Sequence, residues 1–188
     1  MNKIFVVGGH SGLESWFNKF GFKCVNNPFE ADMFQFMGGE DVTPELYHQD
    51  NRSSYSSFNR DVQEAGYFAI AQRLNKPCVG ICRGGQFLNV MCGGSMIQHV
   101  DGHTRDHKMI IVKTGKEIVA TSTHHQMMMP NDDAVVLAYA SIVKDIDPEV
   151  VWYKEQRCLC FQPHPEYQKY KLIEEYYFQL IHSLILEN

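Results

Sequence analysis

One cysteine of the chain combines several features of a nucleophile. Cys82 lies in 77-PCVGICRGGQ-86, with a glycine two residues to either side of it. The apolar run before it predicts a strand and the residues after it predict a helix, so the thiol sits on a tight turn at the carboxyl end of a sheet, where ligands bind in open α/β folds. A helix N-terminus next to the sulfur favours the thiolate. The alternative is a buried core residue, because free cysteines are among the most buried residue types.

A cysteine nucleophile needs a base, and the base needs a group that orients it. His164 lies in 161-FQPHPEY-167, directly after a strand-like run, with Glu166 two residues further on. The prolines on both sides disfavour a regular helix, so the two side chains can point the same way and hydrogen-bond. His-Pro-Glu alone is a weak signal, but together with Cys82 it predicts a Cys-His-Glu triad.

Six segments of the chain resemble, in family order, the peptidase C26 branch of the class I glutamine amidotransferase superfamily, which holds γ-glutamyl hydrolases and γ-glutamyl-γ-aminobutyrate hydrolases. The segments are 38-GGEDVTPELY-47, 60-RDVQE-64, 80-GICRGGQFLNV-90, 93-GGSMIQH-99, 122-STHHQ-126 and 162-QPHPE-166. The resemblance implies an α/β fold, a flavodoxin-like three-layer sandwich with a mostly parallel central sheet. It also implies cleavage of the γ-amide of a glutamyl group, and we expect one such domain over residues 1–188.

The resemblance also implies roles for single residues. Cys82 would attack the γ-carbonyl and form a glutamyl thioester. His164 would take up the thiol proton and deliver it to the leaving amine, while Glu166 holds the imidazole in its working tautomer. The oxyanion hole would consist of the backbone N–H groups of Gly39 and Arg83, which leaves the Arg83 side chain free for other work.

The same resemblance suggests which residues contact the small-molecule γ-glutamyl substrate. These candidates come from the helix after Cys82 and from the Ser-x-His-His-Gln segment: Gln86, His124, His125 and Gln126. Each has a structural alternative. Gln86 would otherwise be a helix-surface residue, and the other three would hydrogen-bond loop backbone.

Strand-like and helix-like segments alternate along the chain, which predicts a mostly parallel sheet with helices on both faces. We expect strands at 3–7, 22–25, 32–37 and 78–81, several between 109 and 153, and one at 159–161. Helices are expected at 11–20, opened by a capping box from Ser11 to Glu14, at 59–74, from 83 to the glycines at 93 and 94, and at 168–186. The second helix should bury a face that includes Val62, Phe68 and Ala71, and residues 40–58 should form a long loop.

Length and composition limit the other function classes. The 188 residues are 44% hydrophobic, enough for one soluble domain with a proper core. A net charge of -5 gives no basic surface for nucleic acid. We expect no membrane partner, because no run approaches the roughly 20 apolar residues of a span, and no secretory signal. Six cysteines without framework spacing indicate reduced thiols and a cytoplasmic location.

Three histidines invite a metal hypothesis. His99, His103 and His107 follow one another at four-residue intervals, and helical histidines at this spacing can share zinc. Gly102 and the loop-like stretch around it argue against a helix, and the resemblance assigns no metal. We therefore expect no metal and no cofactor.

Three functions of different classes remain open. A stand-alone hydrolase of a γ-glutamyl amine or peptide is favoured, because the sequence contains no synthetase domain. A glutaminase subunit that supplies ammonia to a separate synthetase or ligase is the main alternative. A non-catalytic binding relative is disfavoured by the presence of Cys82, His164 and Glu166. A homodimer is an open alternative for the oligomeric state.

Overall fold

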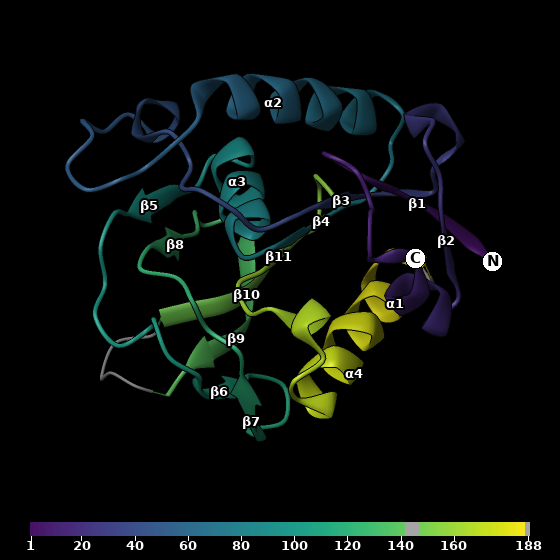
Figure 1. Cartoon of the computed structure of the whole chain (residues 1–188). Coiled ribbons are helices and arrows are strands. Elements are labelled where there is room, and N and C mark those ends of the chain that lie inside the picture. Colours follow the sequence, from purple (N-terminus) through teal and green to yellow (C-terminus); the bar gives the residue numbers. More distant parts are fainter. Residues whose placement is uncertain (142–146, 187–188) are drawn as a thin grey trace.

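The computed structural model describes residues 1–141 and 147–186, and its core is one large sheet (Figure 1). Most strands lie close to the predicted positions, whereas the strand at Ser95–Ile97 was not predicted. In chain order they are β1 Asn2–Val6, β2 Phe22–Cys24, β3 Met33–Phe36, β4 Cys78–Ile81, β5 Ser95–Ile97, β6 His107–Ile111, β7 Glu117–Ala120, β8 Met127–Met129, β9 Ala134–Ala140, β10 Asp147–Tyr153 and β11 Cys158–Phe161.

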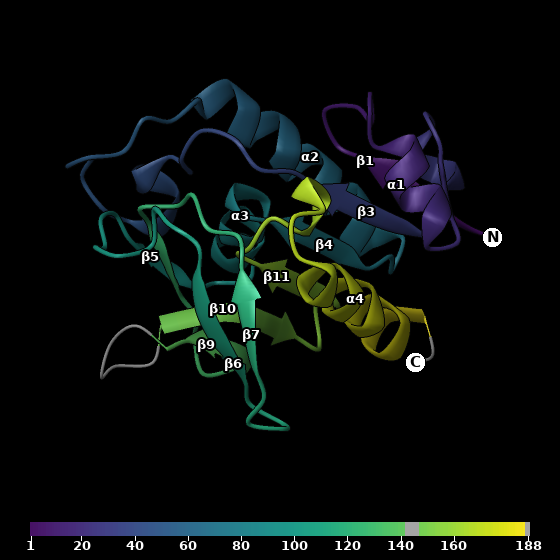
Figure 2. The ribbon, with the colours of Figure 1, turned by 60° about the horizontal axis from the view of Figure 1, so that its bottom comes forward.

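The large sheet has the strand order β2-β1-β3-β4-β11-β10-β9-β6-β7, and β5 pairs with β8 in a separate ribbon. The neighbouring strands β2, β1, β3, β4 and β11 run parallel to one another. The strands β10, β9, β6 and β7 continue the sheet beyond β11, and each pairs with its neighbours in antiparallel fashion. Figure 2 shows these antiparallel strands at the end of the sheet that lies away from α1. The α/β sandwich with a mostly parallel central sheet is confirmed, and the antiparallel extension is a feature that the alternation did not predict.

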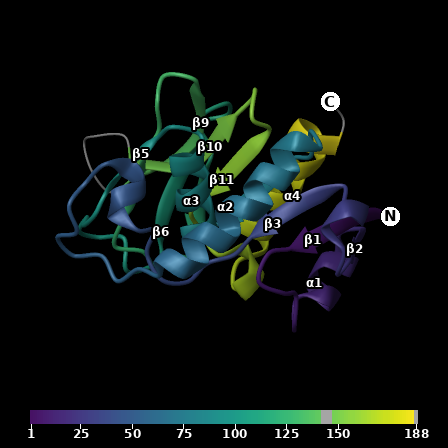
Figure 3. The ribbon, with the colours of Figure 1, turned by 90° about the horizontal axis from the view of Figure 1, so that it is seen from above.

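Helices cover both faces of the parallel strands, which explains why β3, β4 and β11 are buried along their whole length. Figures 1 and 3 show α2 and α3 on one face, and α1 and α4 on the other. Phe34, Phe36 and Phe87 belong to the hydrophobic core on the side of α2 and α3. Trp16 and Phe17 belong to the hydrophobic core on the side of α1 and α4. The helices are α1 Glu14–Lys19, α2 Phe58–Arg73, α3 Arg83–Met91 and α4 Lys171–Leu180, followed by a π-helix Ile181–Leu186.

Two local predictions about helices are wrong. Helix α1 begins at Glu14 rather than at Ser11, because Gly12 has a φ of +82°, and the residue that precedes the helix is Leu13, which supplies no side-chain cap. Helix α2 buries Phe68 and Ala71 as expected, but Val62 is 55% exposed. Asp61 and Glu64 are buried in its place, because both carboxylates pair with arginines.

The segment 40–58 is mostly irregular, as predicted, and it also contains a short 3-10 helix, Pro44–Tyr47. A single bridge between Asp41 and Ser56 joins its two ends. The segment therefore folds back on itself beside the carboxyl end of β3. Among residues 1–141 and 147–186, no helix is both long enough and apolar enough to cross a membrane.

Candidate active site

Cys82 occupies a sharp turn between β4 and α3. Its backbone has φ 50° and ψ -116°, a conformation that non-glycine residues adopt at a cost and that recurs at functional sites. The turn is fixed because the Cys82 N–H donates to the carbonyl of Phe161 at 2.8 Å and its carbonyl accepts from Gln86 N at 3.0 Å. A side chain at Gly84 would collide with the backbone of Phe36, so only glycine lets α3 approach β3 this closely. The thiol is thus held at the carboxyl end of the sheet.

The structure brings His164 and Glu166 together with Cys82. His164 follows β11, the strand next to β4, and its Nδ1 donates to Glu166 Oε1 at 2.7 Å. Its Nε2 lies 3.0 Å from the hydroxyl of Thr123. Tyr167 stacks on the imidazole, with 4.4 Å between the ring centroids and 7° between the planes. With Nδ1 engaged by the carboxylate, Nε2 is the nitrogen left for proton exchange.

The surroundings of His164 favour its protonated form. Burial of the ring lowers its pKa, but hydrogen bonds to Cys82 and Glu166 outweigh burial and raise the pKa from the ordinary 6.5 to about 10. An imidazolium beside a thiol favours the thiolate. Because the folded pKa lies above the unfolded one, protonated His164 stabilises the fold fully below pH 6.5, and this contribution is lost as the pH rises to about 10.

We expect the imidazole nitrogens of His164 to titrate near pH 10 in a nitrogen-15 NMR experiment. Cys82→Ala removes one of the two partners that raise the value while the ring stays buried, so the pKa of His164 should fall. His10 serves as the internal reference, because its raised pKa comes from hydrogen bonds to Asn26 and Glu14, which Cys82→Ala does not touch. A wild-type value near 6.5 would contradict the coupling between His164 and Cys82.

The turn at Gly38 and Gly39 faces this group from the end of β3. Gly39 has a φ of +146°, in the region that favours glycine, and a side chain there would collide with the guanidinium of Arg60. That guanidinium donates from Nη2 to the carbonyls of Met37 at 3.0 Å and Gly38 at 3.1 Å, and from Nη1 to Glu40 at 2.7 Å. Arg60 therefore fixes the conformation of the turn.

The side chain of Arg83 is not free, which corrects the sequence-based expectation. It is 1% exposed and donates to Asp61 and Glu64 of α2. Asp61 also accepts from the backbone N–H of Thr43 at 3.0 Å, and Glu64 accepts from Arg60 at 2.8 Å. The segment 60-RDVQE-64 thus joins the Gly38-Gly39 turn to the first residue of α3, and these are the two places where the oxyanion donors are expected.

A cavity of about 250 Å³ opens above the thiol. All four candidate substrate contacts line it, together with Gly39, Asp41, Cys82, Arg83, Thr123, His164 and Tyr167. Gln86 is 2% exposed and donates to Gln162 Oε1 at 3.1 Å, so it is not a helix-surface residue. Gln126 donates to the hydroxyl of Ser54 at 2.6 Å, and the His125 ring lies 3.2 Å from the Asp41 carboxylate.

His124 differs from its neighbours in where its ring lies. Its Nδ1 donates to the carbonyl of Gln126 at 2.8 Å, and its Nε2 lies 3.5 Å from the buried carboxylate of Glu149. The ring therefore belongs to a second cluster behind the cavity wall.

Several residues of this site have no role predicted from the sequence. Thr123 and Arg60 lie within matched segments, but the resemblance gives neither of them a function, and Tyr167 follows Glu166 directly. Asp41, the partner of His125, lies two residues after Gly39. Their positions in or beside the matched segments were the available signal, but which side chain faces the thiol depends on the fold.

Comparison with known proteins leads to the same class of protein that the sequence motifs resemble, the glutamine amidotransferases. A glutamine amidotransferase-like protein of Lactococcus lactis subsp. lactis, YvdE, is 28% identical over 159 residues, which cover 72% of this chain and 66% of that protein. This chain spans less than two thirds of the length of the curated relatives that it matches first. Residues 29–141, more than half of the chain, match the family Peptidase C26.

Solved structures share the fold. A GMP synthase component from Thermoplasma acidophilum has a TM-score of 0.69 at 19% identity and covers 97% of this chain and 95% of its own. A glutamine amidotransferase of Thermotoga maritima has a TM-score of 0.66 at 14% identity, with coverages of 95% and 83%. At these identities the likeness shows the fold alone, which is that of class I glutamine amidotransferases. With the match over residues 29–141, the chain belongs to the peptidase C26 family.

Proposed function

We propose that the protein is a cysteine-dependent hydrolase that cleaves the γ-glutamyl amide bond of a glutamine-like or γ-glutamyl-amine substrate. The observation that carries the proposal is the convergence of Cys82, His164 and Glu166 at the carboxyl end of adjacent parallel strands. Family membership supports the same class of chemistry. The six free cysteines support a reducing, cytoplasmic setting.

The proposed reaction passes through a thioester. The Cys82 sulfur attacks the γ-carbonyl carbon, and the oxyanion accepts hydrogen bonds from the N–H groups of Gly39 and Arg83. When the intermediate collapses, the C–N bond breaks and the amine leaves with the proton of His164. Water then adds to the thioester and gives its proton back to His164, which releases glutamate and the thiol. Glu166 keeps Nδ1 protonated throughout, so that Nε2 exchanges the protons.

The walls of the cavity support a glutamyl group as the part of the substrate that is recognised. A free glutamyl group carries an ammonium and a carboxylate, and the cavity presents Asp41, His125 and the amides of Gln86 and Gln126. Polar groups placed in a small pocket fix the orientation of a ligand. The amine on the other side of the scissile bond would lie at the open mouth of the cavity. The serine-rich loop 53–57 contacts the cavity wall, because Ser54 accepts from Gln126.

Incubation of the purified protein with four substrates tests the function. Glutamine, γ-glutamyl-putrescine, γ-glutamyl-γ-aminobutyrate and a γ-glutamyl dipeptide should be compared by release of glutamate. We expect release from at least one of them, and the matching α-glutamyl dipeptide should be inert. If all four substrates remain intact, the hydrolase proposal is wrong.

Gly39→Ala tests the proposed oxyanion hole. A Cβ at residue 39 would displace the Arg60 guanidinium, and the positive φ strains any side chain, so the N–H should turn away from the oxyanion. Loss of one such donor lowers kcat on the order of 10² to 10³-fold. Gly66→Ala in α2 is the matched control, because nothing lies within 4 Å of that position. It should keep the wild-type kcat; an unchanged kcat for Gly39→Ala would remove residue 39 from the mechanism.

A second candidate function is supply of ammonia to a separate synthetase or ligase. The fold likeness to a component of a GMP synthase favours it. It predicts weak glutaminase activity alone, stimulation by a partner protein, and an apolar surface at the mouth of the site. A cavity of about 530 Å³ between β9 and α4 has apolar residues along most of its lining, but it shares no residue with the cavity at Cys82. The stand-alone hydrolase is therefore the preferred proposal.

A further inference from the structure

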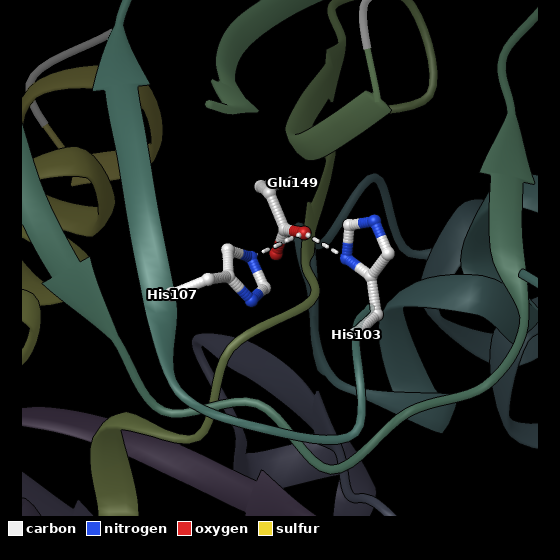
Figure 4. Close-up of side chains that lie close together, drawn as sticks. All are labelled: His103, His107 and Glu149. Carbon is white, nitrogen blue, oxygen red and sulfur yellow. Dashed lines mark hydrogen bonds and ion pairs between the residues drawn. The ribbon is translucent and has the colours of Figure 1, made fainter. Parts of the chain in front are cut away.

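A second cluster of titratable side chains lies behind the wall of the active-site cavity. Figure 4 shows His103 and His107 on either side of Glu149, with both rings directed at its carboxylate. His107 is the first residue of β6, Glu149 lies in β10, and His103 lies in the segment between β5 and β6. The side chains of His103 and Glu149 are fully buried. Each of His103, His107 and Glu149 offers one possible metal-ligand atom, and these three atoms lie within 4.8 Å of one another.

Three ring nitrogens converge on a single carboxylate oxygen. Glu149 Oε1 lies 3.2 Å from His103 Nδ1, 3.0 Å from His107 Nε2 and 3.5 Å from His124 Nε2. Tetrahedral zinc with nitrogen and oxygen ligands at about 2.0 Å places neighbouring ligand atoms about 3.3 Å apart. The three separations from Oε1 lie in this range.

The outer nitrogen of each ring already has an acceptor. His107 Nδ1 lies 3.2 Å from the carbonyl of Arg105, His124 Nδ1 lies 2.8 Å from the carbonyl of Gln126, and His103 Nε2 lies 3.1 Å from the Asp147 carboxylate. A histidine that donates its outer N–H to a carbonyl or carboxylate turns the lone pair of its other nitrogen inward, and this arrangement is typical of metal ligands. Three such lone pairs would here face a carboxylate.

Several inward atoms also lack hydrogen bonds. Within residues 1–141 and 147–186, His103 Nδ1, His124 Nε2 and Glu149 Oε2 are buried and have no hydrogen-bond partner. Buried polar atoms without partners are costly, and a cation between them would satisfy all three. We propose that His103 Nδ1, His107 Nε2, His124 Nε2 and Glu149 bind one zinc ion. This inference does not depend on the proposed hydrolysis, and it replaces the sequence-based expectation that the chain holds no metal.

The ligand set indicates a structural ion. Four protein ligands close the coordination sphere, whereas catalytic zinc keeps an open position. The ion would join β6 and β10 to the segment that carries Thr121 and Thr123. Thr121 donates to the carbonyl of His164 at 2.8 Å, and Thr123 lies 3.0 Å from its ring, so the ion would lie next to a segment that contacts His164.

Metal analysis of protein purified without a metal-affinity step tests the proposal. We expect close to one zinc per chain, and X-ray absorption at the zinc edge should show four nitrogen or oxygen ligands at about 2.0 Å. Removal of zinc by a chelator should lower Tm, and added zinc should restore it. These measurements use the wild-type chain, so they stand even if a ligand variant fails to fold.

Three variants compare the cluster with a surface histidine. Glu149→Gln and His107→Gln should lose the zinc. His99→Gln is the matched control, because His99 is exposed, lies in the same region of the chain and interacts with Asp101 and His125 rather than with the cluster. It should retain the metal. The proposal is overturned if the wild-type chain contains no zinc and binds none in a calorimetric titration, or if the ligand variants retain it.

Discussion

Cys82→Ala should abolish glutamate release while the protein stays folded. Loss of the nucleophile in an enzyme of this kind lowers kcat on the order of 10⁴ to 10⁶-fold, because the base and the oxyanion donors then act on nothing. The thiol is 7% exposed, and alanine fits the space without strain beyond that already present at φ 50°. Circular dichroism and Tm should therefore stay near the wild-type values. Activity is followed as glutamate released under saturating substrate.

Cys24→Ser is the control for this substitution. Cys24 is a half-buried cysteine at the end of β2, and it lies outside the cavity at Cys82. It should keep the wild-type rate, which separates loss of the nucleophile from a general effect of removing a thiol. Turnover that survives in Cys82→Ala at more than a hundredth of the wild-type rate would move the nucleophile elsewhere.

Arg83→Met should destabilise the protein strongly. Methionine keeps the length of the side chain but leaves the carboxylates of Asp61 and Glu64 buried beside an apolar group. Removal of one partner from a buried ion pair costs about 3–5 kcal/mol, because an uncompensated charge remains. For a chain of this size, Tm should fall by roughly 10 °C. Thermal and urea unfolding both measure the effect.

Two comparisons isolate the cause of this loss. Lys108→Met breaks an exposed pair with Glu117 at 2.9 Å and should change stability by less than about 1 kcal/mol. Adding Asp61→Asn and Glu64→Gln to Arg83→Met removes the buried charges, so part of the stability should return. If the free energy of unfolding of Arg83→Met lies within about 1 kcal/mol of the wild-type value, the ion pairs of Arg83 with Asp61 and Glu64 do not hold α3 to α2.

The place of Cys82 on a turn at the carboxyl end of the sheet was predictable, because it depends on neighbours in sequence. The glycines around Cys82, the apolar run before it and the helix after it together specify the turn between β4 and α3. His164 and Glu166 are also local to one another, and the parallel pairing of β4 with β11 brings them to the thiol. The alternating α/β pattern does not specify that pairing, because β5 to β10 lie between the two strands in the chain. The resemblance of 80-GICRGGQFLNV-90 and 162-QPHPE-166 to one family connected the two segments.

The supporting contacts were not predictable in this way. Helical spacing predicted that Val62 lies on the buried face of α2. The hydrophobic pattern could not predict that Asp61 and Glu64 are buried there, because their burial depends on ion pairs with Arg83. The sequence singled out His103 and His107 as possible zinc ligands together with His99, but it could not show that Glu149 lies between them. His103 and His107 are four residues apart on a turn and a strand, and Glu149 comes from a strand 42 positions after His107. Only the fold brings them together.

Labelling with an electrophilic glutamine analogue is the most direct test of the central claim, that Cys82 is a nucleophile poised for a γ-glutamyl carbonyl. The analogue should add once to the wild-type chain, peptide mass spectrometry should place it on Cys82, and excess glutamine should slow the reaction. The Cys82→Ala chain should stay unlabelled, although its five other cysteines remain. Label on another residue, or no label at all on the folded wild-type protein, would contradict the claim.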